Sequence, residues 1–241
     1  MLQAAISVIY PARCLLCQAM TETDFGLCGA CWRDTPFIDG LVCHSCGTPL
    51  PGEGDDTGVA EACDECMTTA RPWEAGRAAL LYRDNGRRIV LGIKHSNRSD
   101  LARAAAGWMA RAAKGLMSPE TLIVPVPLHW TRLLSRSHNQ AADLARGLAR
   151  ETGAEMCPDA LVRTRRTAIL GGLGADARFE MLADAIAPHR KRGLRMKGRP
   201  VLIVDDVMTS GATAAAATEA ALRAGAATVS VLHLARATKG D

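Results

Sequence analysis

The chain has 241 residues, of which 48% are hydrophobic, and a formal net charge of +4. A chain of this length and hydrophobicity can bury a core and form one large domain with a smaller appendage, as an ordinary soluble globular protein does. No stretch approaches the roughly twenty apolar residues of a membrane span. We therefore expect no membrane-spanning segment and a cytoplasmic location.

The opening segment, MLQAAISVIYPARC, is apolar. It lacks the basic start and the small-residue cleavage site of a secretory signal, and its uncharged run is only about ten residues long. We expect a short helix that packs on the body of the protein.

The charge is divided unevenly along the chain. Residues 1–72 carry three Lys/Arg against ten Asp/Glu, a net of −7, whereas residues 73–241 carry 26 against 15, a net of +11. This change predicts a domain boundary near Arg71-Pro72, with an N-terminal region at 1–72 and a second domain at 73–241. The basic excess of the second domain indicates either a solvated surface or one that binds the phosphates of a substrate or of nucleic acid.

The acidic region contains eight of the nine cysteines, arranged as four C-x-x-C pairs. Two-residue spacing lets a tight turn present both thiolates to one metal ion, and two such turns complete a tetrahedral four-sulfur site. We therefore predict two structural zinc ions in a double zinc ribbon. The predicted ligands are Cys14, Cys17, Cys28, Cys31, Cys43, Cys46, Cys63 and Cys66.

Other uses of these cysteines fit less well. Nothing marks the chain as secreted, which disfavours disulfides, and a redox pair normally stands alone near a strand–helix unit. The thiolates of an iron–sulfur cluster are usually grouped more closely. Sequential pairing and an interleaved cross-brace use the same eight residues, so the sequence leaves the pairing open. The segments between the pairs are too polar to build a core, so metal binding must supply their folding energy.

Beyond Arg71, short apolar runs alternate with alanine-rich segments of helical spacing. This alternation predicts an α/β fold, a parallel sheet with helices on both faces. Ligands of such folds bind at the carboxyl ends of the strands. The expected strands are at 78–82, 122–127, 201–204 and 228–234, and the expected helices at 100–116, 139–153 and 212–226.

The segment VLIVDDVMTSGAT joins a predicted strand to a predicted helix. Its small residues and hydroxyls at a helix N-terminus are suited to hold a phosphate. Asp205 and Asp206 would repel that phosphate but can accept charge-assisted hydrogen bonds from the vicinal hydroxyls of a ribose. No G-x-x-x-x-G-K-[ST] motif accompanies the strand, which argues against an ATPase. The predicted phosphate-binding residues are Thr209, Ser210, Gly211, Ala212 and Thr213.

This segment resembles the phosphoribosyl-pyrophosphate-binding motif of type I phosphoribosyltransferases. Together with the eight-cysteine region, the whole chain resembles the ComF family of competence proteins. The resemblance implies that the acidic pair binds the ribose of phosphoribosyl pyrophosphate (PRPP) and that Mg²⁺ bridges ribose and pyrophosphate oxygens. It includes residues 125–140, whose Arg132 and Arg136 would meet the pyrophosphate, and residues 163–182, a mobile catalytic loop that contains Arg178.

The chain departs from the family pattern at a few positions. Ser137 and His138 replace a usual Gly-Phe before Asn139-Gln140, and Leu170 and Met181 stand where a glutamine and an asparagine are usual. Lys94 resembles a recurrent family lysine. Through the Leu170 and Met181 changes, the mobile catalytic loop loses two polar groups that could contact a substrate, so the sequence predicts ligand binding more strongly than phosphoribosyl transfer.

Two hypotheses follow. The first is a phosphoribosyltransferase-like ComF protein that binds PRPP and Mg²⁺ and acts in or beside DNA uptake. The second is a non-catalytic module of the same fold, which either senses a ligand or binds single-stranded DNA or partner proteins such as DNA-uptake proteins. The segment 188–199 carries six Lys/Arg and no acid. It is either a solvated hairpin or a strip that binds nucleic acid phosphates.

Overall fold

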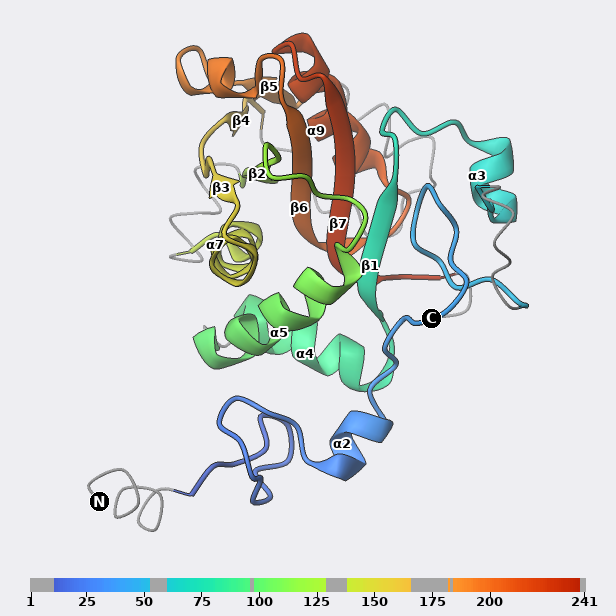
Figure 1. Ribbon diagram of the computed structural model, residues 1–241, viewed down its shortest axis with the longest axis vertical. Helices are drawn as coiled ribbons and strands as arrows, with labels where there is room; N and C mark the ends of the chain where they lie inside the picture. Colours follow the sequence, from blue (N-terminus) through green and yellow to red (C-terminus); the bar gives the residue numbers. More distant parts are fainter. Residues whose placement is uncertain are drawn as a thin grey trace.

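The structure is a computed structural model that describes residues 11–52, 60–95, 98–128, 138–165, 182 and 184–238. Figure 1 shows a twisted sheet with helices against its faces and, beside it, two cysteine-bearing segments with little regular structure. Among the described helices, none is long and apolar enough to cross a membrane. The apolar opening segment lies almost entirely outside the described residues.

Five parallel strands form the main sheet in the order β1-β7-β6-β2-β3. The central strand is β6, in which Val204 pairs with Leu232 on one side and with Pro125 on the other. Because its neighbours run parallel to it, the carboxyl ends of these strands meet at one edge of the sheet. The strands are β1 (Gly76–Leu81), β2 (Leu122–Pro125), β3 (Glu155–Met156), β6 (Pro200–Met208) and β7 (Thr228–Arg236).

Both faces of the sheet are covered. Val201 and Ile203 of β6 enter a hydrophobic cluster with α9, while Leu202 and Val204 enter a second cluster with α4, α5 and α7. All four side chains are at most 2% exposed. Burial on both faces explains why this strand reads as an uninterrupted apolar run. The helices are α4 (Asp84–His95), α5 (Ser99–Ala112), α7 (Gln140–Thr152) and α9 (Ala212–Arg223).

Local sequence sets the ends of the helices nearest the site. The side chain of Asn139 accepts a hydrogen bond from the Ala141 N–H at 3.1 Å and so caps the start of α7, which ends at Gly153 with φ 71°. Helix α9 starts directly after Gly211, whose φ of 84° favours glycine. The alanines of α9 let the helix lie close to the sheet.

The two cysteine-bearing segments contact different parts of the α/β body (Figure 1). The first contains α2 (Gly29–Arg33) and contacts α4, where the Asn85 side-chain amide donates to the Cys31 carbonyl at 3.2 Å. The second contains α3 (Asp64–Thr68) and contacts β1, where the Gly76 N–H donates to the His44 carbonyl at 2.8 Å. A side chain at Gly76 would collide with the Ser45 carbonyl. The second segment therefore lies against the edge strand.

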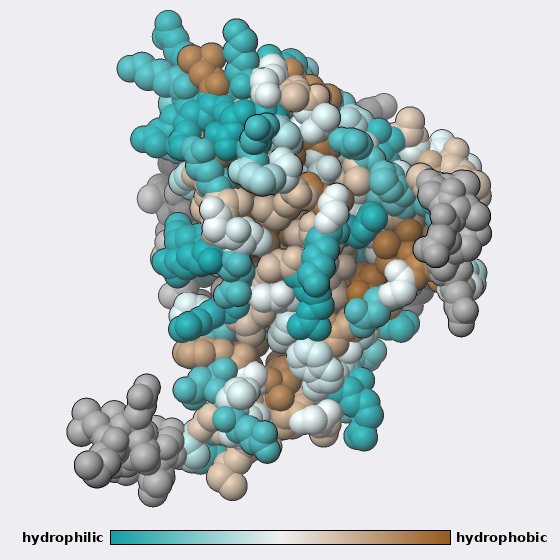
Figure 2. Space-filling view, in the orientation of Figure 1, coloured by the Kyte–Doolittle hydropathy of each residue, from teal (hydrophilic) through white to brown (hydrophobic). Residues whose placement is uncertain are grey.

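A small antiparallel hairpin is formed by β4 (Leu161–Arg163) and β5 (Ile186–Pro188). The basic segment that follows forms the 3-10 helix η1 (Arg192–Met196), not the solvated hairpin considered for it. Figure 2 shows hydrophilic side chains gathered over this end of the molecule. Arg192 forms an ion pair with Asp159, and both Arg195 and Arg199 form ion pairs with Glu155.

The predicted α/β class is confirmed, and the expected strands and helices are present as β1, β2, β6, β7, α5, α7 and α9. Helix α4 was not predicted, because Gly86 and Gly92 lower the helix propensity of its sequence. Gly92 is needed there, since a Cβ would lie 2.7 Å from a methyl carbon of Leu101. The domain boundary near Arg71-Pro72 stays a prediction.

Candidate functional site

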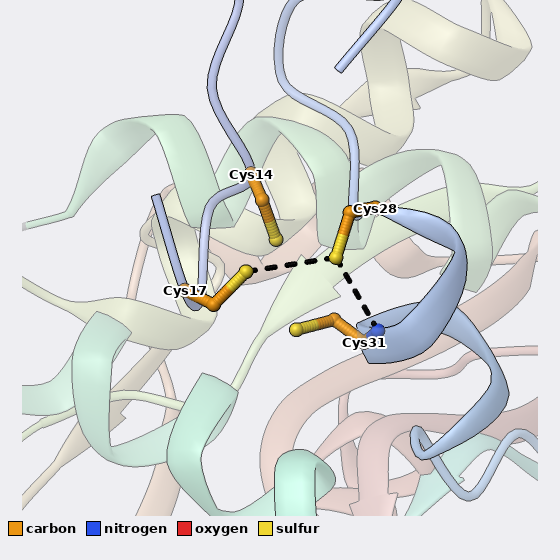
Figure 3. Close-up of side chains that lie close together, drawn as sticks. All are labelled: Cys14, Cys17, Cys28 and Cys31. Atoms are coloured by element: carbon orange, nitrogen blue, oxygen red, sulfur yellow. Dashed lines mark hydrogen bonds between the residues drawn. The ribbon is translucent and has the colours of Figure 1, made fainter. Parts of the chain in front are cut away.

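The first cysteine cluster brings together Cys14, Cys17, Cys28 and Cys31. Figure 3 shows the four side chains converging from two turns of the chain. Their sulfur atoms lie within 4.8 Å of one another, and the Cys17 and Cys28 sulfurs are 3.5 Å apart. Cys28 is also the N-cap of α2 and accepts a hydrogen bond from the Cys31 N–H at 3.5 Å.

The second cluster consists of Cys43, Cys46, Cys63 and Cys66. Its sulfur atoms also lie within 4.8 Å of one another, and those of Cys46 and Cys63 are 3.6 Å apart. Each cluster joins consecutive C-x-x-C pairs, so the pairing is sequential and the interleaved arrangement is wrong. His44 is outside the cluster, and its backbone bonds to Glu61 and Gly76 instead.

Both clusters fit zinc. A zinc–sulfur bond of about 2.3 Å in a tetrahedron places sulfur atoms about 3.8 Å apart, close to the separations found here. Burial raises the pKa of Cys31 to about 12 and that of Cys66 to about 11, so these thiols need a cation in order to ionise together with their neighbours. The two tetrads support two structural zinc sites. With four thiolates each, they leave no open position for chemistry at the metal.

The acidic pair lies in the last part of β6, so the aspartates are within the strand and not after it. The Asp205 carboxylate accepts a hydrogen bond from the Asp206 N–H at 2.9 Å, and an Asp206 oxygen lies 3.2 Å from the Lys94 ammonium. Burial, and then the negative charge of Asp206, raise the pKa of Asp205 to about 7. Near neutral pH, Asp205 is therefore close to the midpoint of its titration.

Of the five predicted phosphate-binding residues, Ala212 and Thr213 begin α9, and Thr209, Ser210 and Gly211 form the loop between β6 and α9. The loop borders a small hollow lined by Asp205, the segment 207–214 and His233. A Cβ at Gly211 would lie 2.9 Å from the Arg71 guanidinium and 3.0 Å from the Trp73 ring, so this position has room only for glycine. The N-terminal turn of α9 faces the same end of the sheet and favours negative charge there.

Two buried arginines hold the backbone of this loop. Arg71 donates to the Ser210 carbonyl at 2.6 Å, and Arg236 donates to the carbonyls of Met208 at 3.2 Å and Thr209 at 2.5 Å. Both guanidinium groups also bond to the carboxylate of Glu65, in the second C-x-x-C pair of the second tetrad. The second tetrad is thus connected to the candidate phosphate loop.

Comparison with known proteins decides the family. A family model described as a double zinc ribbon domain matches residues 5–67. The chain is 32% identical over 233 residues to the DNA utilization protein YhgH of Shigella flexneri and to that of Escherichia coli strain K12, covering 94% of this chain and 97% of each relative. It is also 26% identical over 232 residues to Competence protein F of Haemophilus influenzae, covering 93% of this chain and 97% of that protein. The chain belongs to the ComF family.

Not every site residue predicted for this ComF family protein can be placed. Arg132, Arg136 and Arg178 lie outside the described residues, so their contact with a ligand stays a prediction. Asn139 and Gln140 do open a helix, as expected, and their side-chain amides donate to the carbonyls of Val126 at 3.1 Å and Lys94 at 3.4 Å. These two contacts fix the start of α7 beside the segment that carries Lys94.

Sequence reasoning missed four residues around the loop: Glu65, Arg71, Arg236 and His233. His233 pairs in register with Asp205 and is 1% exposed, and its Nδ1 has no hydrogen-bond partner among the described residues. Burial, and then the charge of Arg236, lower the pKa of His233 to about 3, so the ring is neutral. The only sequence signal for His233 was a histidine within an apolar strand run.

The tetrads predict the metal content of the purified protein. We expect two zinc ions per chain by elemental analysis, and one per chain in either Cys17→Ser or Cys66→Ser, because three thiolates bind zinc more weakly than four. A Cys157→Ser variant is the control and keeps two, because Cys157 lies outside both tetrads. Iron with visible charge-transfer absorption, or a single zinc in the wild type, would contradict this assignment.

The raised pKa of Asp205 predicts an unusual pH dependence of stability. The folded protein holds this proton up to about pH 7, whereas an unfolded aspartate loses it near pH 4, so ionisation of Asp205 lowers the free energy of unfolding as pH rises between these values. Asp205→Asn should therefore gain stability relative to the wild type as pH rises from about 4 to about 7, by up to about 1.4 kcal/mol for each pH unit, and the difference should stay constant above that range.

Urea unfolding of both proteins at several pH values measures this difference. Asp39→Asn, which alters an exposed carboxylate, is the matched control and should follow the wild type throughout. A wild-type-to-Asp205→Asn difference that does not change with pH would show that Asp205 titrates normally.

Proposed function

We propose that this ComF family protein binds PRPP with Mg²⁺ at the carboxyl end of β6 and acts in DNA uptake or utilisation. The observation that carries the proposal is that Asp205 and Asp206 lie on the same central strand that leads into the loop 209–211 and the N-terminus of α9. One segment thus offers acceptors for hydroxyl groups beside donors for a phosphate. A ribose 5-phosphate presents those two groups together.

The charges at this edge support a ligand that carries a cation. The Lys94 ammonium lies 3.2 Å from Asp206, and Asp205 still resists ionisation because of its burial and of the negative charge of Asp206. Mg²⁺, when bound with PRPP, would supply the positive charge that favours both carboxylates in their ionised form. The aspartates would then orient the ribose, and the loop would hold the 5-phosphate through its N–H and hydroxyl groups.

A role in transferring the ribose would need further groups. Displacement of pyrophosphate at the anomeric carbon passes through a cationic, oxocarbenium-like transition state, and arginines suit the departing pyrophosphate because they present paired donors. We assign Arg132, Arg136 and Arg178 to this role on the family resemblance. The binding proposal is independent of turnover.

The direct test of binding is calorimetric titration of PRPP with Mg²⁺ into the zinc-loaded protein. We expect saturable binding that weakens about tenfold to a hundredfold in Asp206→Ala, because a charge-assisted hydrogen bond contributes about 1.5–3 kcal/mol. Glu219→Ala, on the exposed face of α9, is the matched control and should bind as the wild type does. Absence of binding in the folded wild type would reject the ligand.

The second candidate function is single-stranded DNA binding. Relatives named for DNA utilization and competence support it, as does the exposed basic surface around η1. Within the described residues, no acid pairs with Arg190, Lys191 or Lys197, whereas the other three basic residues of this segment form ion pairs with two carboxylates, Asp159 and Glu155. The free positive charge of this surface is therefore smaller than its sequence suggests.

Fluorescence anisotropy with a single-stranded oligonucleotide between 50 and 200 mM salt tests this candidate. Replacing Arg190, Lys191 and Lys197 with alanine should weaken binding and reduce the salt slope by about two, because each lost phosphate contact removes about 0.7 from it. A control triple variant in which Arg33, Arg87 and Arg103 become alanine should change the slope less. Binding that is absent or insensitive to salt would exclude this surface.

A further inference from the structure

Glu65 connects the second tetrad to two buried cations. It lies between Cys63 and Cys66, and its two carboxylate oxygens accept hydrogen bonds from Arg71 at 2.8 Å and from Arg236 at 3.0 Å. The arginine side chains are only 2% and 3% exposed. Removing the shared carboxylate would leave two uncompensated buried charges, which is far more costly than losing a surface ion pair.

The two arginines fix the direction of three peptide groups. They bond to the carbonyls of Met208, Thr209 and Ser210, and none of the described peptide bonds is cis. In a trans peptide, the N–H of the next residue points opposite to the carbonyl. The carbonyls face the arginines and the second tetrad, so the N–H groups of Thr209, Ser210 and Gly211 are directed to the other side.

Further contacts join the same loop to the ligands of the second tetrad. The Arg71 guanidinium interacts with Cys66. Arg236 also donates to the Thr48 hydroxyl at 3.1 Å, and this hydroxyl lies 3.1 Å from the Cys46 sulfur.

The Cys43–Cys46 turn reaches the loop through Trp73. The Trp73 ring lies against Gly211 and donates through its indole N–H to the Ser45 carbonyl at 2.5 Å. Both turns of the second tetrad thus contact residues that support the loop.

The first tetrad has different neighbours. Among the described residues, the Leu15 carbonyl accepts from Arg98 at 3.1 Å and the Cys31 carbonyl accepts from Asn85 at 3.2 Å. Arg98 directly precedes α5, and Asn85 is in α4. These contacts stabilise the packing of the first segment against the two helices. They do not involve the loop after β6.

We propose that Glu65 is a positioning residue through which the second metal site holds the end of β6 and the loop 209–211 in the conformation that receives a phosphate. Occupancy of the second tetrad then sets the ligand affinity of the loop, and occupancy of the first does not. The effect on affinity rests on the proposed function, namely PRPP binding. The effect on the loop itself does not depend on any ligand.

Glu65→Gln tests this role, because it keeps the size of the side chain and removes the charge that the two arginines share. Asp64→Asn is the matched control: it makes the same change at the adjacent, exposed residue, which forms no ion pair with the described residues. Zinc content is measured first, and we expect two ions per chain in both variants.

Hydrogen–deuterium exchange of ligand-free protein then reports on the loop. We expect the amides of 209–213 to exchange at least tenfold faster in Glu65→Gln than in the wild type, with β2 and α7 unchanged and Asp64→Asn like the wild type. PRPP affinity should fall at least tenfold in Glu65→Gln alone. Wild-type exchange in a Glu65→Gln protein with two zinc ions would overturn the proposal.

The outcomes separate this inference from the proposed function. Faster loop exchange in Glu65→Gln, with no PRPP binding even in the wild type, would support the positioning role and reject the ligand. PRPP binding that is unchanged by Glu65→Gln, with unchanged exchange, would keep the ligand and reject the role.

If Glu65→Gln does not fold, removing zinc from the wild-type protein with a chelator tests the same role of the second metal site. Exchange of segments 13–33 and 60–69 reports the loss of each metal separately. Hydrogen exchange in the loop should become faster when the second zinc is lost and should not change when the first is lost. Loop exchange that follows loss of the first zinc, or that does not respond to loss of the second, would reject the proposal.

Discussion

The position of β6 in the middle of a parallel sheet constrains the rest of the structure. Its side chains are buried on both faces and its backbone is paired on both edges, so polar side chains can be placed only toward its carboxyl end. Asp205 and Asp206 lie there, and the loop and α9 follow at once. The same burial that makes the strand apolar raises the pKa of Asp205. The central position of β6 thus explains both where the acidic pair lies and why burial raises the pKa of Asp205.

The second zinc segment is part of the architecture of this site. Two buried guanidinium groups would be unfavourable alone, and Glu65 and the loop carbonyls offset that cost by binding both of them. A zinc segment has little core of its own, so its fold depends on its metal. Placing Glu65 between two metal ligands therefore makes the position of its carboxylate depend on the metal as well. The first zinc segment contacts α4 and the start of α5 and has no such connection in the described structure.

Much of the fold could be predicted because its signals are local. The apolar runs identify strands, the alanine-rich segments identify helices, and the C-x-x-C spacing identifies the tetrads. The pairing of the tetrads could not be derived, because both arrangements use the same spacing. Helix α4 was missed because its glycines serve close packing that only the folded structure reveals.

The contacts that support the loop are long-range. Arg71 bonds to a residue 139 positions later, and Glu65 to one 171 positions later. No periodicity or motif in a single sequence relates such residues. Arg71 was noted only because the change in charge ends beside it, and the roles of Arg132, Arg136 and Arg178 stay predictions.

A crystal structure of the zinc-loaded protein with PRPP and Mg²⁺ tests the central claim most directly. We expect the 5-phosphate to lie against the N–H groups of residues 209–213 and the ribose hydroxyls against Asp205 and Asp206, with Arg71 and Arg236 still bonded to Glu65. A ligand bound elsewhere, or a phosphate on the side of the loop that faces the arginines, would contradict it.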